Sequence, residues 1–270
     1  MRERVLSAFV LGLPVLAMLI AGDVWMALLV LIISGIALLE LNHLVARRGH
    51  RASGGLMLLW LGLFVLDRVT PERELLQPGA ALLLIVTMGW ALIRFRQGTV
   101  NAFSGFALTI AGSFYVGWSM THFVGIRALE DGLFWTLSVV FSTWMADTGA
   151  YLLGRRIGRT PLMKDVSPKK TWEGYLSGIV FATAFGALLP LLWQALGASD
   201  AVSPLRGAAL ALLVATVAPL GDLAMSMVKR YVDVKDSSNL IPGHGGFLDR
   251  LDSIIVAGLL GYYYLTLLVF

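Results

Sequence analysis

The chain has 270 residues, of which 57% are hydrophobic and 14% charged, whereas a typical soluble domain carries about 25% charged residues. A water-soluble fold would expose much of this apolar surface, so the composition favours an all-α, polytopic integral membrane protein. The lack of cysteine excludes thiol nucleophiles, cysteine metal sites and disulfides, and the net charge of +4 indicates topology and phosphate handling rather than nucleic-acid binding.

Apolar stretches follow one another along the chain, and nine of them suit a membrane-spanning helix, which needs about 20 residues. The first follows a basic start that resembles a signal peptide, but no A-x-A-like cleavage site precedes the second, so we expect an uncleaved span. The third is short and interrupted by glycines. We predict a single membrane domain over residues 1–270, with spans at about 4–22, 24–45, 52–67, 78–94, 102–124, 132–153, 174–196, 205–228 and 252–270.

Basic residues lie almost entirely in alternate loops of this nine-span arrangement. The N-terminus and the loops after the second, fourth, sixth and eighth spans hold 17 of the 21 Lys and Arg residues. Basic loops of membrane proteins stay preferentially in the cytoplasm. We therefore expect a cytoplasmic N-terminus and a C-terminus, Phe270, on the opposite face.

Apart from acids at the end residues of a span, three acidic residues fall inside predicted spans, where a charge costs about 2.5–3.5 kcal/mol near the helix centre. Glu40 could snorkel or pair with a nearby arginine, and this explanation is as good as a role in chemistry. Asp147 could make a hydrogen bond between packed helices. Asp222 is followed by Lys229 and Arg230 near the end of its span, and a purely structural role is less expected there.

The stretch from residue 221 to residue 252 places carboxylates at two helix ends. If its first part is helical, one face carries four polar residues at i, i+4, i+7 and i+8, namely Asp222, Ser226, Lys229 and Arg230. Asp249 and Asp252 form an i, i+3 pair at the start of the next helix. Crowded carboxylates in a low dielectric repel one another, so they either bind protons or hold a cation. Oxygen ligands without His or Cys favour Mg²⁺.

Basic and glycine residues near these acids could hold an oligophosphate beside the metal ion. Gly243, Gly245 and Gly246 flank His244 and allow a tight turn whose N–H groups point at an anion. His244 could act as a general base, but ordering the loop or donating to a phosphate is the simpler interpretation. The bases of this group are Lys169, Lys170, Lys229, Arg230, Lys235 and Arg250.

The polar motifs of the C-terminal half together resemble the signature of the phosphatidate cytidylyltransferases, or CDP-diacylglycerol synthases. The motifs that carry the resemblance are Ser226, Lys229-Arg230, Lys235-Asp236, Ser237-Ser238, residues 242–246, Asp249-Arg250, Asp252 and the two segments 146–151 and 167–174. The N-terminal spans resemble that family only in hydropathy. The resemblance implies Mg²⁺-dependent conversion of CTP and phosphatidic acid to CDP-diacylglycerol and pyrophosphate in a bacterial inner membrane. It also suggests a homodimer among membrane lipids, and a second cation beside Mg²⁺ stays open.

The resemblance and the polar pattern together assign candidate roles within residues 144–252. By similarity, Asp222 and Asp249 would be the metal ligands, with Asp252 and Asp147 close by. The candidate catalytic residues are Asp222, Asp249, Lys229, Arg230 and His244. The candidate substrate-binding residues are Lys169, Lys170, Ser226, Lys235, Asp236, Gly245, Gly246 and Arg250.

Two other functions fit parts of this pattern. A secondary transporter of a phosphorylated solute would also use intramembrane acids and basic loops, although here the acids crowd one face and no matching pair of broken helices is evident. A CTP-dependent membrane kinase acting on a polyprenol-type alcohol would transfer the γ-phosphoryl group and release CDP. The reaction product therefore distinguishes these functions.

Overall fold

The computed structural model describes residues 2–241 and 245–270, with side chains for 12–241 and 245–270. Helices make up most of the described residues, as the sequence predicts. The chain divides into two compact units, unit 1 comprising Met1–Val124 with Tyr231–Leu251 and unit 2 comprising Gly125–Arg230 with Asp252–Phe270. Each unit therefore combines segments that are distant in the sequence.

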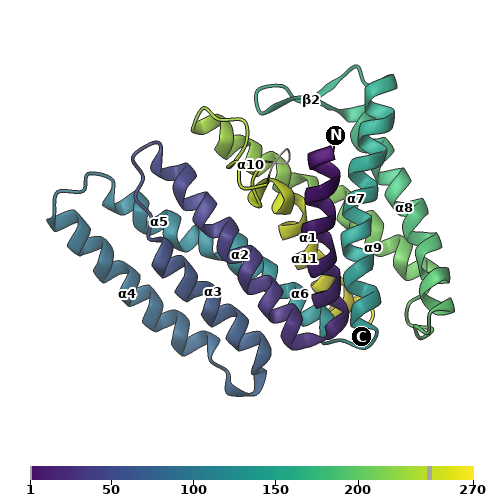
Figure 1. Ribbon diagram of the computed structural model, residues 1–270, viewed down its shortest axis with the longest axis horizontal. Coiled ribbons are helices and arrows are strands. Elements are labelled where there is room, and N and C mark those ends of the chain that lie inside the picture. The colour runs from purple at the N-terminus through teal and green to yellow at the C-terminus, as the bar shows by residue number, and fades with distance from the viewer. Residues whose placement is uncertain (1, 242–244) are drawn as a thin grey trace. The chain divides into compact units, whose positions relative to one another are not determined.

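Unit 1 is built on the buried face of α3 (Gly54–Val69). The hydroxyl of Ser53 caps this helix by accepting the N–H of Leu56 at 3.3 Å. Trp60 and Phe64, one turn apart, pack on Phe114 with ring centroids 5.6 and 5.1 Å away. The other helical elements of this unit include α1 (Arg2–Ala21), α2 (Asp23–Ala46), η1 (Pro71–Arg73), α4 (Leu76–Arg96), α5 (Ala102–Gly112), η2 (Ser113–Trp118) and the first residues of α6 (Ser119–Arg127) (Figure 1).

Unit 2 is held together where helices approach one another at small residues. A Cβ at Gly178 would lie 2.5 Å from the carbonyl oxygen of Ala146, and one at Gly186 would lie 2.7 Å from that of Gly207. Glycine at these positions lets the helix backbones pack closely, as is common between membrane helices. The helices are α7 (Gly132–Ile157), α8 (Trp172–Ala195) and α9 (Pro204–Val217), which lie side by side (Figure 1), together with α10 (Pro219–Tyr231) and, from Asp252 onward, α11 (Leu248–Leu268).

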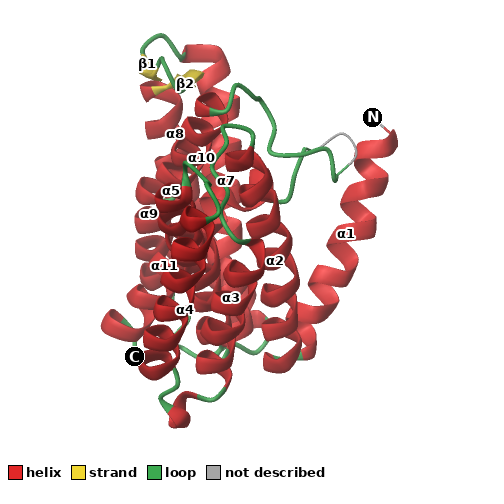
Figure 2. Ribbon diagram, turned by 90° about the vertical axis from the view of Figure 1, so that its left-hand side faces the viewer, coloured by secondary structure: helices red, strands yellow, loops and turns green. Residues whose placement is uncertain are grey.

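The polar loop after α7 folds into a hairpin that the all-α prediction missed. β1 (Pro161–Met163) pairs antiparallel with β2 (Ser167–Thr171), which leads directly into α8 (Figure 2). The carboxylate of Glu173 accepts the N–H of Arg159 at 3.1 Å and the hydroxyl of Thr160 at 2.8 Å. The short strands form because a loop of this length has many backbone N–H and C=O groups outside helices, and these groups pair with one another.

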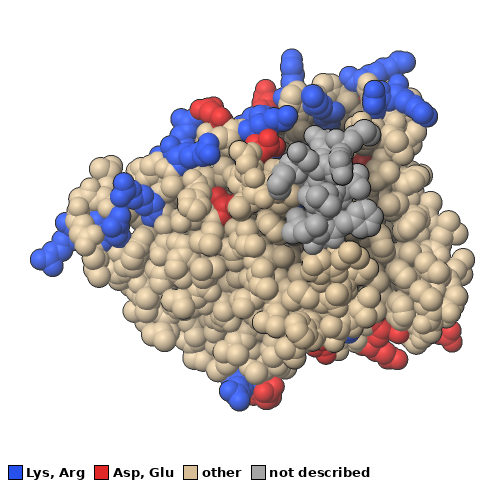
Figure 3. Space-filling model, in the orientation of Figure 1, with Lys and Arg blue, Asp and Glu red and all other residues tan. Residues whose placement is uncertain are grey.

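Apolar helices indicate a membrane protein. Most of the surface that Figure 3 shows belongs to residues other than Lys, Arg, Asp and Glu. The sequence predicts more spans than the five helical stretches named next, and the total of nine crossings stays a prediction. Within the described residues, five helical stretches are long and apolar enough to cross a membrane, namely Asp23–Ala46, Leu76–Arg96, Trp172–Ala195, Pro204–Tyr231 and Leu248–Leu268.

The close contact at Gly178 generates a test of how unit 2 packs. Gly178→Ala adds a methyl group against the Ala146 carbonyl, and such overpacking costs about 1–3 kcal/mol. We expect a lower thermal unfolding midpoint for this variant in detergent. The matched control is Gly89→Ala in α4, where a Cβ meets nothing within 4 Å, and its midpoint should stay the same or rise. Equal midpoints for the two variants would contradict the helix contact.

Candidate active site

Asp222 lies where the chain turns from one helix into the next. α9 ends at Val217 and α10 begins at Pro219, whose missing N–H suits the start of a helix. The eighth predicted span is therefore two helices, with outer limits close to those predicted. The half-buried carboxylate of Asp222 forms an ion pair with Lys170 of β2 and accepts the hydroxyl of Ser226 at 3.2 Å. The predicted i, i+4 pairing of Asp222 with Ser226 on one helix face is confirmed.

Asp252 comes close to Asp222 because α10 and α11 meet at a glycine. A Cβ at Gly221 would collide with the carbonyl group of Asp252, so a larger residue would force these helices apart. The Asp252 carboxylate lies within electrostatic range of Asp222, Lys229 and Lys170. Two of the four predicted metal ligands thus lie together, and the lysines offset the repulsion between them.

A cavity of about 490 Å³ adjoins this pair in unit 2. Lys170 connects the two features, since it lines the cavity and also forms the ion pair with Asp222. The volume lies within the range of about 300–1,000 Å³ that is usual for small-molecule sites. Basic side chains in the lining favour phosphate groups. The polar lining includes Asp147, Tyr151, Arg155, Ser167, Lys169, Lys170, Thr171 and Tyr175.

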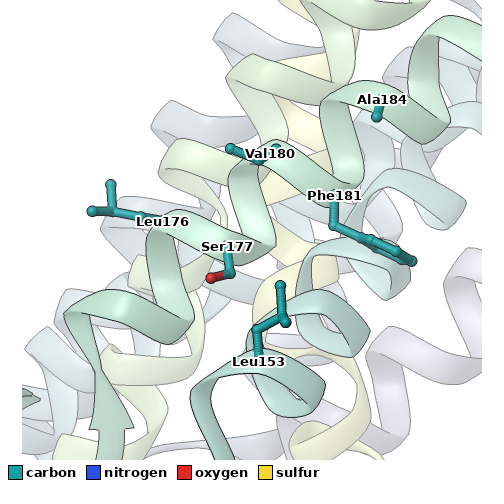
Figure 4. Close-up of a pocket in the computed structure, with 6 residues that line it drawn as sticks. All are labelled: Leu153, Leu176, Ser177, Val180, Phe181 and Ala184. Atoms are coloured by element: carbon teal, nitrogen blue, oxygen red, sulfur yellow. The ribbon is translucent and has the colours of Figure 1, made fainter. Parts of the chain in front are cut away.

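A second hollow, of about 390 Å³, is lined by uncharged residues among those that the structure describes. It lies on α7 and α8, and its lining residues are Leu153, Leu176, Ser177, Val180, Phe181 and Ala184 (Figure 4). The Ser177 hydroxyl donates to the carbonyl oxygen of Glu173 at 2.6 Å. The remaining surface suits hydrocarbon rather than phosphate, so the basic cavity is the candidate site for a polar substrate.

The end of α10 supports the hairpin that carries the cavity lysines. Arg230 is exposed, and its Nε donates to the carbonyl oxygen of Val166 at 3.2 Å, in the turn between β1 and β2. Lys229, which precedes it, is half-buried and interacts electrostatically with Asp252. These two candidate catalytic residues therefore have different surroundings in unit 2.

Further candidate residues lie in unit 1, in the loop that leads into α11 and in the first turn of α11. Asp249 accepts the N–H of Ser237 at 2.7 Å, the hydroxyl of Ser237 at 2.8 Å and the N–H of Gly246 at 3.1 Å. Gly245 adopts a left-handed conformation with φ of 82°, and its carbonyl oxygen accepts the N–H of Ile241 at 2.9 Å. These contacts close the loop onto the first turn of α11.

The other predicted residues of this loop make no comparable cluster in the described part of the chain. Lys235, Asp236 and Arg250 are exposed. Pro242, Gly243 and His244 lie outside the described residues, and the predicted role of His244 stays a prediction. Arg48 of unit 1 fastens the start of the loop, since it forms an ion pair with Asp233.

Glu40 of α2 makes contacts beside the candidate residue Asp249 that the sequence did not predict. Its buried carboxylate accepts the hydroxyls of Ser237 and Ser238 and the N–H groups of Phe247 and Leu248. The explanation that Glu40 snorkels or pairs with an arginine is therefore wrong. Its partners follow 197 or more residues later in the chain, and the one signal for it was an acid in an apolar helix.

The contacts of His50, which follows α2, were not predicted either, and one of them is with Tyr231, which ends α10 just before the same loop. One ring nitrogen is 2.8 Å from the Ser104 hydroxyl, and the other is 2.7 Å from the Tyr231 hydroxyl. The guanidinium carbon of Arg48 lies 5.6 Å from the centre of the Tyr231 ring. Arg48 and His50 together hold the segment after α10 against the end of α2.

Comparison with known proteins places this sequence in a family. The sequence profile described as the cytidylyltransferase family matches residues 2–268. The chain belongs to the cytidylyltransferase family. This match confirms the resemblance that the polar motifs predicted, and it extends that resemblance over the N-terminal helices.

Individual relatives support the same assignment to the cytidylyltransferase family. The chain is 30% identical to a phosphatidate cytidylyltransferase of Bacillus subtilis, over 99% of its own length and 98% of that protein. It is 34% identical to a phosphatidate cytidylyltransferase of Brucella suis, over 97% of its length and 92% of that protein. A phosphatidate cytidylyltransferase of Synechocystis is 40% identical over 66% of this chain and 57% of its own.

The carboxylates of this cytidylyltransferase fit the way in which proteins bind Mg²⁺ with a phosphate substrate. No group of three His, Cys, Asp or Glu side chains among the described residues forms a complete protein metal site. Mg²⁺ is usually bound through one or two carboxylates plus substrate phosphates, and Asp222 and Asp252 supply such a pair. Asp147 lines the adjoining cavity. Asp249 belongs to unit 1, and its part in metal binding stays a prediction.

Lys170 provides a direct test of the candidate site. Lys170→Met keeps the length of the side chain but removes the charge that lies between the cavity and Asp222. We expect cytidylyltransferase activity in purified membranes to fall on the order of 100-fold, because charge stabilisation in such sites is worth that much. Lys164→Met is the matched control, since Lys164 is exposed in the turn of the same hairpin. Similar activity in the two variants would contradict the assignment of the cavity.

Proposed function

We propose that the protein is a phosphatidate cytidylyltransferase, which converts CTP and phosphatidic acid to CDP-diacylglycerol and pyrophosphate. The match over residues 2–268 supports this proposal, as do the full-length relatives that bear this name. The structural observation that carries it is the basic cavity, joined through Lys170 to the carboxylates of Asp222 and Asp252.

The reaction brings two polyanions together, so it needs charge compensation and placement rather than an activated nucleophile. A phosphate oxygen of phosphatidic acid, already anionic near neutral pH, attacks the α-phosphorus of CTP. A bond forms between these atoms while the bond from the α-phosphorus to the bridging oxygen of the leaving pyrophosphate breaks. The attacking oxygen carries no proton that must be removed. No Ser, His or Cys nucleophile is therefore required.

The basic side chains of the cavity would perform the compensation. Lys169, Lys170 and Arg155 line it and can hold the triphosphate in line with the incoming lipid phosphate. Gly174 also lines the cavity, and a Cβ there would lie 3.0 Å from the carbonyl oxygen of Ala150, so this glycine lets the start of α8 pack closely on α7. Lys169 and Lys170 both belong to strand β2 of the hairpin. Glu173 holds the open end of this hairpin and Arg230 holds its turn, so the strand that carries the two lysines is fixed.

Mg²⁺ in this site would neutralise phosphate charge and stabilise the departing pyrophosphate. Asp222 and Asp252 would hold it, and Lys170 and Lys229 keep these carboxylates compensated before substrate and metal bind. We propose Asp249, in the first turn of α11, as a further ligand, and a second cation stays open.

The same proposal places the site at the cytoplasmic face of a bacterial inner membrane, where CTP and phosphatidic acid can both reach it. The 17 basic residues on one side of the predicted topology support a cytoplasmic N-terminus and a C-terminus on the opposite face. Nine crossings and a homodimer belong to the same set of expectations. The long apolar helices support residence in a membrane.

Product analysis tests the reaction. Purified protein in mixed micelles of detergent and phosphatidic acid should convert CTP labelled at the α-phosphorus into labelled CDP-diacylglycerol, with one pyrophosphate per lipid. Removing Mg²⁺ with EDTA should abolish the conversion, and added Mg²⁺ should restore it, because the two polyanions then regain their counter-charge. Release of CDP with a phosphorylated lipid would instead identify a kinase, and turnover that persists in EDTA would contradict the metal requirement.

Asp222 is the residue on which the proposal rests most heavily. Asp222→Asn keeps the shape of the side chain but removes the charge that pairs with Lys170. We expect a loss of at least about 100-fold in turnover, with normal amounts of protein in the membrane. Asp165→Asn, at an exposed acid in the hairpin turn, should retain full activity. Near-normal turnover of the Asp222 variant would overturn the metal assignment.

A further inference from the structure

Glu40 is the most deeply buried acid among the described residues, with only 4% of its surface exposed. It lies well inside α2 between buried leucines, namely Leu38, Leu41 and Leu44. An acid at this depth in an apolar helix carries a large desolvation cost unless its oxygens are satisfied. The proposed reaction uses no group at this position, so the burial of Glu40 must have another cause.

The Glu40 carboxylate accepts hydrogen bonds from the loop before α11 and from the first residue of α11. Its Oε1 accepts the Ser238 hydroxyl at 2.6 Å and the Phe247 N–H at 3.1 Å. Its Oε2 accepts the Leu248 N–H at 2.8 Å and the Ser237 hydroxyl at 3.1 Å. The two N–H groups lie at the start of α11, where backbone donors have no partner inside the helix and a negative charge is favourable.

Asp249 lies directly after this loop, in the first turn of α11. The Ser237 hydroxyl lies within hydrogen-bond distance of both Glu40 and Asp249, and its single proton can be donated to only one of them at a time. The N–H groups of Ser237 and Gly246 bind Asp249 in addition. A Cβ at Gly246 would lie 2.5 Å from the Glu40 carboxylate, so this contact also requires glycine. Glu40 and Asp249 are thus joined through the residues that lie between them.

We propose that Glu40 is a positioning residue for cytidylyl transfer, which sets the orientation of the Asp249 carboxylate by fixing Ser237, Ser238 and the start of α11. This inference rests on the proposed function, in which Asp249 is a metal ligand. In this proposal Glu40 does not bind the metal or the substrate itself. It acts through the serine hydroxyls and the first backbone N–H groups of α11.

A carboxylate is needed here because four donors converge on two acceptor oxygens. Glu40→Gln has nearly the same volume, but its amide nitrogen is a donor and would face a backbone N–H and a serine hydroxyl. The variant should therefore loosen the loop without creating a cavity in α2. Ser238→Ala is a milder variant, since it removes one donor to Glu40 and leaves the carboxylate in place.

Hydrogen–deuterium exchange of the purified full-length protein in detergent measures the loop without substrates. We expect the amides of Ser237, Gly246, Phe247 and Leu248 to exchange at least about tenfold faster in Glu40→Gln, with α3 unchanged. The Mg²⁺ concentration for half-maximal turnover should rise about tenfold or more, because residues that orient metal ligands typically have effects of that size. Ser34→Ala, another buried polar change in α2 whose hydroxyl has no hydrogen-bond partner in the described structure, should alter neither quantity.

The two measurements separate the possible outcomes. Unchanged loop exchange in Glu40→Gln would overturn the inference, and so would faster exchange with an unchanged Mg²⁺ dependence, since Glu40 would then only stabilise the fold. If Glu40→Gln does not accumulate in the membrane, Ser238→Ala must show the same two changes to a smaller degree, and its failure to do so would also overturn the inference. A wild-type protein that makes no CDP-diacylglycerol would contradict the proposed function instead, whatever the exchange result.

Discussion

Negative charge held at the end of apolar helices is the constraint on which the proposed chemistry depends. Asp222 and Asp252 lie close to one another where α10 meets α11 at Gly221, and each carboxylate raises the energy of the other. Lys170 and Lys229 offset this repulsion. This site balances two carboxylates against two ammonium groups. The carboxylates can therefore bind a divalent cation instead of the ammonium groups, which can in turn bind phosphates.

The two units stabilise their buried carboxylates with different kinds of donor. Unit 2 uses ammonium groups, and Lys170 comes from a hairpin that Glu173 anchors at the start of α8. Unit 1 uses fixed hydroxyl and N–H donors, all of which converge on Glu40. Ammonium groups can follow a phosphate as it binds, whereas backbone donors hold one geometry. This difference agrees with a substrate-binding role in unit 2 and a positioning role in unit 1.

Local features were predictable from the sequence, and long-range partners were not. Hydropathy placed the second span at 24–45, and the helix is Asp23–Ala46, because an apolar run of this length specifies its own limits. Helical periodicity paired Asp222 with Ser226. The break before Pro219 was missed because the apolar run continues through it. The sequence left Glu40 open because its partners depend on how the chain returns, which no local pattern encodes. The polar motifs led to the right family, since their spacing is a property of the sequence itself.

Crystals grown with Mn²⁺ in place of Mg²⁺ and with a non-hydrolysable CTP analogue would test the central claim most directly. The account predicts an anomalous peak within about 2.5 Å of carboxylate oxygens of both Asp222 and Asp252, with analogue phosphates completing its coordination. A peak bound to neither carboxylate, with the triphosphate outside the cavity that Lys169 and Lys170 line, would contradict the account.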